Sequence, residues 1–497
     1  MSEDYASIKG DMARGAAWMV AMRWSLRAVG VINTIIIARM LTPSDFGIAT
    51  MAWIVVEFLM TLADANVDLA LLRTNATSRD RLNTGWTIRL LSGAATAAAL
   101  FAVAPLAATY YHDERVAIVI QITALRALIM GFENIGVLEF RRSLNFRKEY
   151  RYWVWRRVLM LGAGLVLVAV FRNYIALAVA APLSAIITVV VSYVMSPYRP
   201  RLCLVHWREL WTFSQWIILY NTARFMNSRV DQFVIGGTAS AADTGSYYVA
   251  YDTAALPTRE VIWPMGRAFT PTLARIVHDP HEMRKALRGI LGFVVAIALP
   301  AGIGTSLVAA DATLVLLGEQ WTRAAEFFRL LAICGAFESV LLAMESYFIA
   351  RSCERSFTAI NIVQLVVLLP TVIVAGAYFG IDGIAAARTV VTGGAVALMF
   401  GAMVGMGWLR WGELAAVSWR PLLAAAVMAA AVGELHDASI SWRLVSLLHD
   451  VAVGAVVYIT VLAALWRLAG RPDGAEKSIL ALLTTMLRRY GLLKAAL

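Results

Sequence analysis

Charged side chains stand inside the apolar stretches of this sequence. The arginines that lie deepest in such stretches are Arg23, Arg27, Arg126, Arg224 and Arg259. A guanidinium group stays charged and can hold a phosphate or carboxylate group through two parallel hydrogen bonds. The acids in comparable positions are Glu57, Asp231 and Asp252. A carboxyl group in such surroundings can exchange a proton or bind Na⁺. The chemistry that these residues offer is therefore anion binding and ion coupling.

The composition identifies the medium around these charges. Of the 497 residues, 60% are hydrophobic and 15% are charged, whereas a soluble protein carries about 25% charged residues. Apolar stretches of about 20 residues recur along the chain, and each is long enough to cross a hydrocarbon core of about 30 Å. The sequence therefore predicts an all-α polytopic membrane protein. We expect about fourteen transmembrane helices, near residues 14–38, 46–72, 84–109, 116–140, 152–171, 174–196, 209–236, 243–271, 287–308, 322–349, 357–379, 383–409, 418–434 and 444–468.

Charge in lipid is unfavourable, so the deep arginines need partners or water. At about 3 kcal/mol each, five arginines that faced lipid would cost about 15 kcal/mol. One interpretation is structural pairing, because the antiparallel helices 14–38 and 46–72 bring Asp64 to the depth of Arg23. Glu57 similarly reaches the depth of Arg27. The other interpretation is a hydrated, partly cationic cavity. A polar stripe along the predicted helix 209–236 favours the cavity, and its members are Asn221, Arg224, Ser228 and Asp231.

Four further arginines stand nearer to the ends of predicted helices. They are Arg89, Arg267, Arg329 and Arg388. A long charged side chain close to a helix end can extend its head group into the membrane interface. These four guanidinium groups are therefore near enough to helix ends to reach the interface.

Loop charges predict the orientation in the membrane. Nineteen Lys and Arg residues fall in loops on the side of the N-terminus, and four fall in the opposite loops. Because positive residues gather on the cytoplasmic side, we expect an inner-membrane protein with both termini in the cytoplasm. The net charge of +11 reflects this excess, so we expect no nucleic-acid partner. The scattered cysteines and histidines lack metal-ligand spacing, and we expect no metal and no cofactor.

Two segments of the sequence echo each other. "IIIARMLTPSDFGIATM" (35–51) and "FVIGGTASAADTGSYYV" (233–249) place Asp45 and Asp243 at an offset of 198 residues, with Gly47 and Gly245 two positions later. The first two helices then correspond to the seventh and eighth and run in the same direction. This repeat predicts two parallel six-helix lobes around a central cavity, an organisation typical of alternating-access transporters. We expect an N-lobe at 1–206, a C-lobe at 207–410, and two extra helices with an amphipathic cytoplasmic tail at 411–497.

Longer stretches of the chain resemble a known family. "ARMLTPSDFGIA", "LADANVDLALLR", "EFRRSLNFR" and the segment 225–276 are similar to the polysaccharide transporter family of lipid-linked oligosaccharide flippases. That family belongs to the superfamily of multidrug/toxin extruders and the lipid II flippase. The likeness covers most of residues 14–350. Two glycines of the family pattern are absent: Asn66 stands where one usually follows Asp64, and "ARSCERS" (350–356) contains none.

The resemblance implies a function. It implies movement of an undecaprenyl-diphosphate-linked oligosaccharide across the inner membrane, for the synthesis of exopolysaccharide, capsule or O-antigen. The five deep arginines would bind the diphosphate, and the candidates for sugar contact are Tyr220, Tyr248 and Tyr251. The three deep acids would couple transport to protons or Na⁺. The implied partners are the lipid-linked oligosaccharide, membrane lipids and polysaccharide polymerase or export machinery.

Two other functions compete with this hypothesis. A multidrug/toxin-type cation-coupled exporter of the same superfamily would favour acidic cavity residues, which Asp231, Asp252 and Glu57 supply. The deep arginines instead favour an anionic cargo. An enzyme such as a glycosyltransferase or polymerase normally has a sizeable aqueous domain, whereas the longest predicted loops have about 15 residues. We therefore expect transport and no enzymatic activity.

Overall fold

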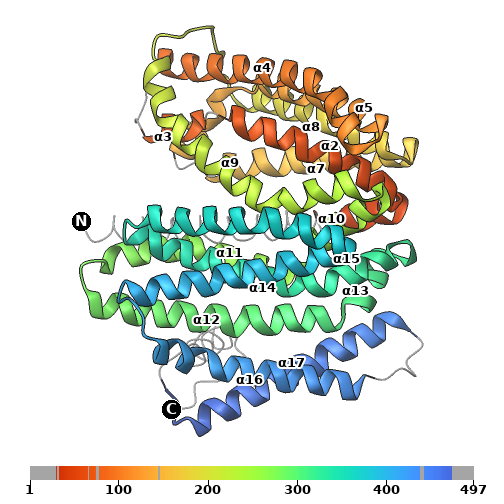
Figure 1. The fold of residues 1–497 in the computed structure, drawn as a ribbon. Coiled ribbons are helices and arrows are strands. Elements are labelled where there is room, and N and C mark those ends of the chain that lie inside the picture. The colour runs from red at the N-terminus through yellow and green to blue at the C-terminus, as the bar shows by residue number, and fades with distance from the viewer. Residues whose placement is uncertain are drawn as a thin grey trace. The chain divides into compact units, whose positions relative to one another are not determined.

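The computed structural model describes residues 30, 33–64, 66–73, 78–143, 146–436 and 442–472. All regular elements in these ranges are helices (Figure 1). The helices are α2 (Pro43–Ala63), α3 (Val67–Arg73), α4 (Arg79–Tyr111), α5 (Glu114–Met130), η1 (Ile135–Val137), α6 (Leu138–Arg142), α7 (Phe146–Phe171), α8 (Tyr174–Met195), α9 (Trp207–Thr238), α10 (Ala241–Ala254), α11 (Leu256–Ile276), α12 (Pro280–Leu307), α13 (Ala309–Leu316), η2 (Glu319–Trp321), α14 (Thr322–Ala350), α15 (Glu354–Gly405), α16 (Trp411–Leu435) and α17 (Arg443–Leu468). Most of the predicted helix 14–38 and most of the amphipathic tail lie outside the described residues.

The chain divides into two compact units, Met1–Gly245 and Ser246–Leu497. The first unit includes α9, which packs against α2 and α4. The sequence begins its C-lobe with this helix, at residue 207. The lobe boundaries at 206 and 410 stay a prediction, as does the central cavity, and each unit is described by itself below.

In the first unit the long helices lie side by side (Figure 1). α5 packs against α4 and α8, α8 against α7, and α2 against α5 and α9. The largest core of this unit is built from small and branched side chains that let these helices approach closely, among them Ile48, Ala52, Leu100, Ala104 and Ile120. This packing brings the ends of α2, α4 and α5 together.

In the second unit α14 is the central helix. It packs against α11, α12, α13 and α15, and α16 packs against α12 and α17. Buried Leu, Met and Phe side chains fill the main core, including Leu287, Leu291, Met344, Phe348 and Met399. The position of α14 among these neighbours buries Ser339 and half-buries Glu338, whereas the polar residues of its first two turns are exposed.

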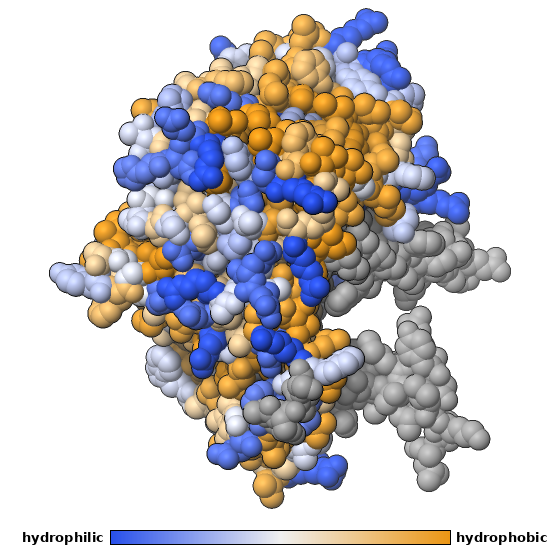
Figure 2. Space-filling view, turned by 90° about the vertical axis from the view of Figure 1, so that its right-hand side faces the viewer, coloured by the Kyte–Doolittle hydropathy of each residue, from blue (hydrophilic) through white to orange (hydrophobic). Residues whose placement is uncertain are grey.

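The surface of the protein fits a membrane. Nine helices of the described chain are long and apolar enough to cross one, and α5 with η1 and α6 forms a further span if this pair, bent by 64°, is counted as one. Large apolar side chains are exposed along α7, α8, α15 and α17. The face in Figure 2 is mixed: hydrophilic residues gather across its left and centre, and hydrophobic residues lie mainly toward the top and upper right. The predicted all-α multi-pass membrane fold is therefore confirmed. The number of fourteen spans and the orientation of the termini stay predictions.

Several predicted helices are interrupted in the structure. The predicted helix 243–271 consists of α10 and α11, which meet at Ala255, with Pro257 in the first turn of α11. Proline has no backbone N–H, so it is tolerated in a first turn but breaks a helix interior. The predicted helix 116–140 ends at Met130, and Asn134 Oδ1 then accepts a hydrogen bond from Gly136 N at 2.9 Å to begin a new turn.

The predicted boundary between helices 357–379 and 383–409 is present within α15, where Gly380 has φ 63° and interrupts the helix.

Each of the two echoed turns caps a helix. Asp45 Oδ2 accepts hydrogen bonds from Thr42 N at 3.0 Å and from Thr42 Oγ1 at 2.6 Å, and Asp45 N donates to Thr42 Oγ1. Ser240 and Asp243 repeat the side-chain part of this arrangement at the start of α10. Such boxes satisfy backbone groups that a helix N-terminus leaves without partners. Asp45 Oδ1 also accepts from Tyr174 N at 2.9 Å, which ties α2 to the start of α8.

The two turns also contact each other reciprocally within the first unit. A Cβ atom on Gly47 would lie 1.6 Å from the Ala241 carbonyl oxygen, and one on Gly245 would lie 2.0 Å from the Pro43 carbonyl oxygen. Ala241 follows Pro43 by 198 residues, and Gly245 follows Gly47 by the same interval. The contact therefore obeys the offset of the repeat, and it requires a residue without a side chain at both glycine positions.

Each of the two segments that lack a family glycine contains a residue with left-handed backbone. Asn66 has φ 45° and Ser352 has φ 54°. Glycine adopts positive φ without strain, asparagine tolerates it, and other residues are strained by about 1–2 kcal/mol. This chain thus makes sharp backbone turns at Asn66 and Ser352, in two segments where the family pattern has a glycine.

We predict that Gly47→Ala lowers the thermal stability of the purified protein. The added methyl group overlaps the Ala241 carbonyl oxygen, and overpacking of this kind costs about 1–3 kcal/mol or more. Thermal unfolding in detergent measures the effect. Gly162→Ala is the matched control, because Gly162 lies in α7 with nothing near its Cβ position, and it should leave the midpoint unchanged or raise it. Equal midpoints for the two variants would contradict the reciprocal contact.

We predict that Ser352→Gly stabilises the protein by about 0.5–1 kcal/mol, because glycine removes the strain at φ 54°. Ser352→Val should destabilise it by more than 1 kcal/mol, since a branched side chain is strained further in this region. Midpoints of thermal unfolding should rank Gly above Ser above Val. A Val variant as stable as the Gly variant would rule out the strain.

Candidate functional site

The predicted site residues of the first unit lie on several helices. Arg126 is half-buried on α5, and its charge interacts with those of Glu57 on α2 and Arg156 on α7. Arg224 is exposed on α9, and Asp231 on the same helix is fully buried. Arg23 and Arg27 lie outside the described residues, as does the side chain of Tyr220. The sequence predicts that Glu57 lies at the depth of Arg27. Among described residues, Glu57 lies near Arg126.

The predicted residues of the second unit come together more closely. Tyr248 is half-buried on α10, while Tyr251 and Asp252 lie near the end of that helix. Arg259 follows on α11, and its Nη1 lies 3.9 Å from Asp252 Oδ1. Three predicted residues, Tyr251, Asp252 and Arg259, therefore belong to one group. The break at Ala255 between α10 and α11 sets their geometry.

Glu338 of α14 is the centre of this group. Its Oε1 accepts hydrogen bonds from Arg388 Nη2 at 2.9 Å and from the Tyr251 hydroxyl at 2.9 Å. Its Oε2 lies 3.6 Å from Arg259 Nη2. The Tyr251 hydroxyl in turn accepts a hydrogen bond from Arg388 Nη2 at 3.1 Å. One carboxylate is thus shared by two guanidinium groups and a phenol, which we call the Glu338 cluster: Tyr251, Asp252, Arg259, Glu338 and Arg388.

A glycine places Glu338 in this position. Gly335 lies one turn before Glu338 on α14, and a Cβ atom there would come within 3.0 Å of Ala255 Cα. The helix can therefore approach the break between α10 and α11 closely. The side chain of Glu338 then meets residues from both sides of the break.

Arg388 differs from its prediction. We expected it to reach the interface, but only 2% of it is exposed. Leaving a guanidinium group buried without a carboxylate is strongly unfavourable, and Glu338 on the neighbouring helix provides that carboxylate. The ion pair with Glu338 holds the Arg388 side chain inside the unit, although Arg388 lies near the start of the predicted helix 383–409.

The two arginines of the cluster are held unequally. Arg388 is buried and makes a short ion pair, whereas about a third of the Arg259 side chain is exposed and its carboxylate contacts are 3.6 and 3.9 Å long. Arg388 alone can neutralise Glu338. Arg259 can therefore turn to an external anion without leaving Glu338 uncompensated.

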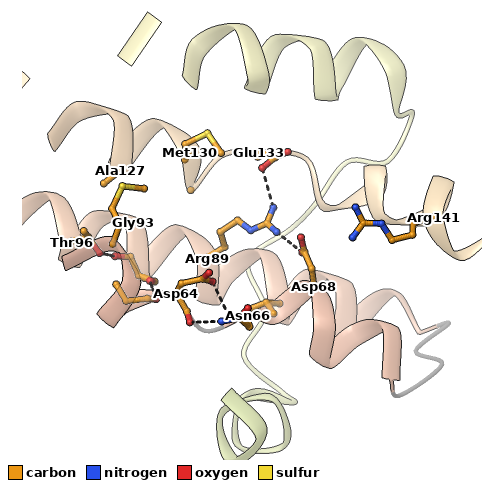
Figure 3. Close-up of a pocket in the computed structure, with 15 residues that line it drawn as sticks. Asp64, Asn66, Asp68, Arg89, Gly93, Thr96, Ala127, Met130, Glu133 and Arg141 are labelled. Carbon is orange, nitrogen blue, oxygen red and sulfur yellow. Dashed lines mark hydrogen bonds and ion pairs between the residues drawn. The ribbon is translucent and has the colours of Figure 1, made fainter. Parts of the chain in front are cut away.

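A polar pocket lies in the first unit, at the C-terminal ends of α2 and α5 and beside residues 89–96 of α4 (Figure 3). Its volume is about 530 Å³. Polar and charged side chains form much of its lining: Asp64, Asn66, Asp68, Arg89, Ser92, Thr96, Glu133 and Arg141. Ala63, Met60, Val67, Ala127 and Met130 supply apolar walls. The pocket is large enough for a small polar molecule.

Arg89 organises one side of this pocket. Figure 3 shows its guanidinium group between Asp68 and Glu133, paired with both. Glu133 Oε1 also accepts a hydrogen bond from the Tyr152 hydroxyl at 2.6 Å, which joins α7 to the network. Arg89 is partly exposed and two carboxylates converge on it, while its place at the membrane interface stays a prediction.

Asn66 shapes the other side of the pocket. Its backbone N–H donates to Asp64 Oδ1 at 2.9 Å, and its side-chain amide donates to the Asp64 carbonyl oxygen at 3.1 Å. These bonds hold the left-handed turn that separates α2 from α3. The turn leaves the Asp64 carboxylate exposed toward the pocket (Figure 3).

Several residues of the two sites were not among the predicted site residues: Asp64, Asp68, Arg89, Glu133, Glu338 and Arg388. A signal existed for Glu338, which is the one charge between residues 330 and 344. A lone carboxylate in such a stretch indicates an internal partner. The sequence does not show which arginine that partner is.

Comparisons with known proteins agree with this architecture. The model of a family described as polysaccharide biosynthesis protein matches residues 36–326. The lipopolysaccharide biosynthesis protein WzxC of Escherichia coli strain K12 is 21% identical over 386 residues, which cover 76% of this chain and 78% of that protein. The succinoglycan biosynthesis transport protein ExoT of Rhizobium meliloti strain 1021 is 25% identical over 327 residues, 65% of this chain and 66% of that protein.

A solved structure shares the fold. The lipid II flippase MurJ in its inward closed conformation superposes with a TM-score of 0.70 at 12% identity, over 91% of this chain and 99% of that chain. At this identity the likeness concerns the fold alone.

We predict that Glu338→Gln destabilises the protein by about 3–5 kcal/mol, because Arg388 loses its carboxylate inside the unit. Removing both charges in Glu338→Gln/Arg388→Met should restore much of the lost stability. Thermal unfolding of the two single variants and the double variant forms a double-mutant cycle. Additive effects of the two substitutions would show that the ion pair does not stabilise the unit.

Proposed function

Because this chain belongs to the polysaccharide biosynthesis protein family whose model it matches, we propose that it is a flippase for a lipid-linked oligosaccharide. The cargo is an undecaprenyl-diphosphate-linked repeat unit, moved across the inner membrane by alternating access for polysaccharide biosynthesis. Support comes from the two relatives, whose names refer to lipopolysaccharide and succinoglycan biosynthesis, and one of which is called a transport protein. Transport, rather than an enzymatic reaction, is the role assigned to the chain.

The Glu338 cluster is the observation that carries this proposal. A diphosphate is anionic, and Arg259 offers it a guanidinium group that is partly exposed and loosely held. Arg388 keeps Glu338 neutralised when Arg259 turns away. The cluster can therefore bind and release an anion at little electrostatic cost, as a carrier requires. Arg23, Arg27, Arg126 and Arg224 are the further arginines that we assign to the diphosphate.

Sugar contact and ion coupling complete the proposal. Tyr220 and Tyr248 are the candidates for sugar contact, whereas Tyr251 acts by orienting Glu338 and Arg388. Asp231, Asp252 and Glu57 are the candidates for coupling to protons or Na⁺. Asp231 is fully buried on α9.

The proposal also covers the surroundings of the protein. The excess of positive charge in one set of loops supports an inner-membrane location with both termini in the cytoplasm. The cargo would then enter from the cytoplasmic leaflet. A polysaccharide polymerase or export machinery would receive it on the opposite side.

We predict that Arg259→Ala reduces flipping of the lipid-linked oligosaccharide in reconstituted vesicles by at least tenfold. A charge-assisted hydrogen bond contributes about 2 kcal/mol, which corresponds to roughly 30-fold in affinity. Protein level and thermal midpoint should remain near those of the unmodified chain, because Glu338 keeps Arg388. Cells that carry the variant should accumulate the lipid-linked intermediate on the cytoplasmic side.

Arg275→Ala is the matched control, since Arg275 is exposed in the last turn of the same helix. It should flip the cargo normally. Normal flipping by Arg259→Ala would remove Arg259 from the binding site. Export of lipophilic cations without any effect on the lipid-linked intermediate would instead favour the multidrug/toxin-type exporter.

A further inference from the structure

The pocket of the first unit differs in chemistry from the Glu338 cluster. Three of its charged residues are acids, Asp64, Asp68 and Glu133, and two are arginines. Both arginines already have carboxylate partners: Arg89 pairs with Asp68 and Glu133, and Arg141 Nε donates to Glu149 Oε1 at 3.1 Å. A diphosphate that entered the pocket would meet more carboxylates than guanidinium groups, and both guanidinium groups are already paired with carboxylates. The pocket therefore disfavours an anionic ligand.

The hydrogen-bonding groups of the pocket favour a ligand that donates. The Ser92 hydroxyl donates to the Ala63 carbonyl oxygen at 2.5 Å, and the Thr96 hydroxyl donates to the Ser92 carbonyl oxygen at 2.8 Å. These hydroxyl hydrogens are therefore used within the protein. Among the described residues, the Asp64 carboxylate accepts one backbone hydrogen bond and interacts electrostatically with Arg89, and the residue is exposed. The pocket thus presents more acceptors than donors to a ligand.

Sugar hydroxyl groups match this lining. A sugar ring is neutral, carries many O–H donors and has apolar C–H faces. Carboxylate oxygens accept from the hydroxyl groups, and Met60, Val67 and Met130 supply apolar walls. A volume of about 530 Å³ lies within the range of about 300–1,000 Å³ typical of small-molecule sites.

We propose that this pocket binds a sugar unit of the glycan, with the Asp64 carboxylate accepting hydrogen bonds from its hydroxyl groups. The inference rests on the proposed function and extends it. The guanidinium group of Arg259 recognises the diphosphate, and the acceptor-rich pocket recognises the glycan. The pocket therefore makes the carrier selective for lipid diphosphate that bears sugar over lipid diphosphate that bears none.

Binding of two probes to the full-length protein in detergent tests this inference. The probes are undecaprenyl diphosphate and undecaprenyl diphosphate that bears a neutral disaccharide, and native mass spectrometry measures their bound fractions. The unmodified chain should bind the disaccharide probe more tightly. Asp64→Asn keeps the shape of the side chain and the acceptor for Asn66 N, and it should weaken binding of the disaccharide probe about tenfold while leaving binding of the sugar-free probe unchanged.

Two further variants complete the design. Ala63→Leu adds bulk at the wall of the pocket and should cause the same selective loss. Asp80→Asn is the control, because Asp80 is exposed in the first turn of α4 and does not line the pocket. It should bind both probes as the unmodified chain does.

The outcomes separate the inference from the proposed function. Equal loss of both probes in folded Asp64→Asn and Ala63→Leu, or equal binding of both by the unmodified chain, would overturn the sugar site and leave the diphosphate carrier intact. Binding of neither probe by the unmodified chain would overturn the proposed function itself. A selective loss of the disaccharide probe in both pocket variants establishes the site.

Discussion

The low polarity of the surroundings is the constraint on which the interior of this protein depends. A charge on a membrane-spanning helix must be paired within the protein or reach water. Glu338 and Arg388 do this for the interior of the second unit, and Arg89 does it for Asp68 and Glu133 in the first. These ion pairs join helices that are far apart in sequence. They decide which charges remain available to a ligand.

In the Glu338 cluster, two arginines share the Glu338 carboxylate unequally. The buried arginine has the short contact, and the partly exposed arginine has the long ones. The first therefore holds the fold, while the second can change partner. The same logic explains the pocket of the first unit, where engaged guanidinium groups leave the carboxylate of Asp64 as the accessible group. The second unit thus offers a guanidinium group to a ligand, and the first unit offers hydrogen-bond acceptors.

Helix breaks place the residues of both sites. The break at Ala255 separates Asp252 from Arg259, and Gly335 lets α14 approach it. The left-handed turn at Asn66 ends α2 below the pocket. The backbone conformation at Ala255, Gly335 and Asn66 therefore helps to position the charged side chains of both sites.

The sequence by itself determined the class of the protein. Its apolar runs, loop charges and motifs were sufficient for the all-α membrane fold and the family, because these depend on the chemistry of whole segments. The offset of 198 residues also came from the sequence, and the reciprocal contact of Gly47 and Gly245 follows it. Tyr251, Asp252 and Arg259 were predicted as site residues because they are polar groups in an apolar segment.

Only the tertiary structure decided how the charges pair. Arg388 was expected at the interface from its distance to a helix end, but Glu338 on a neighbouring helix holds it inside. Arg89 pairs with Asp68 and Glu133, which its distance from a helix end did not indicate. Pairing depends on helix rotation and on breaks such as Ala255 and Asn66, which shift a face by a residue or two. A single sequence does not specify which helices become neighbours. An ion pair between distant segments therefore exists only once packing has brought its two helices together.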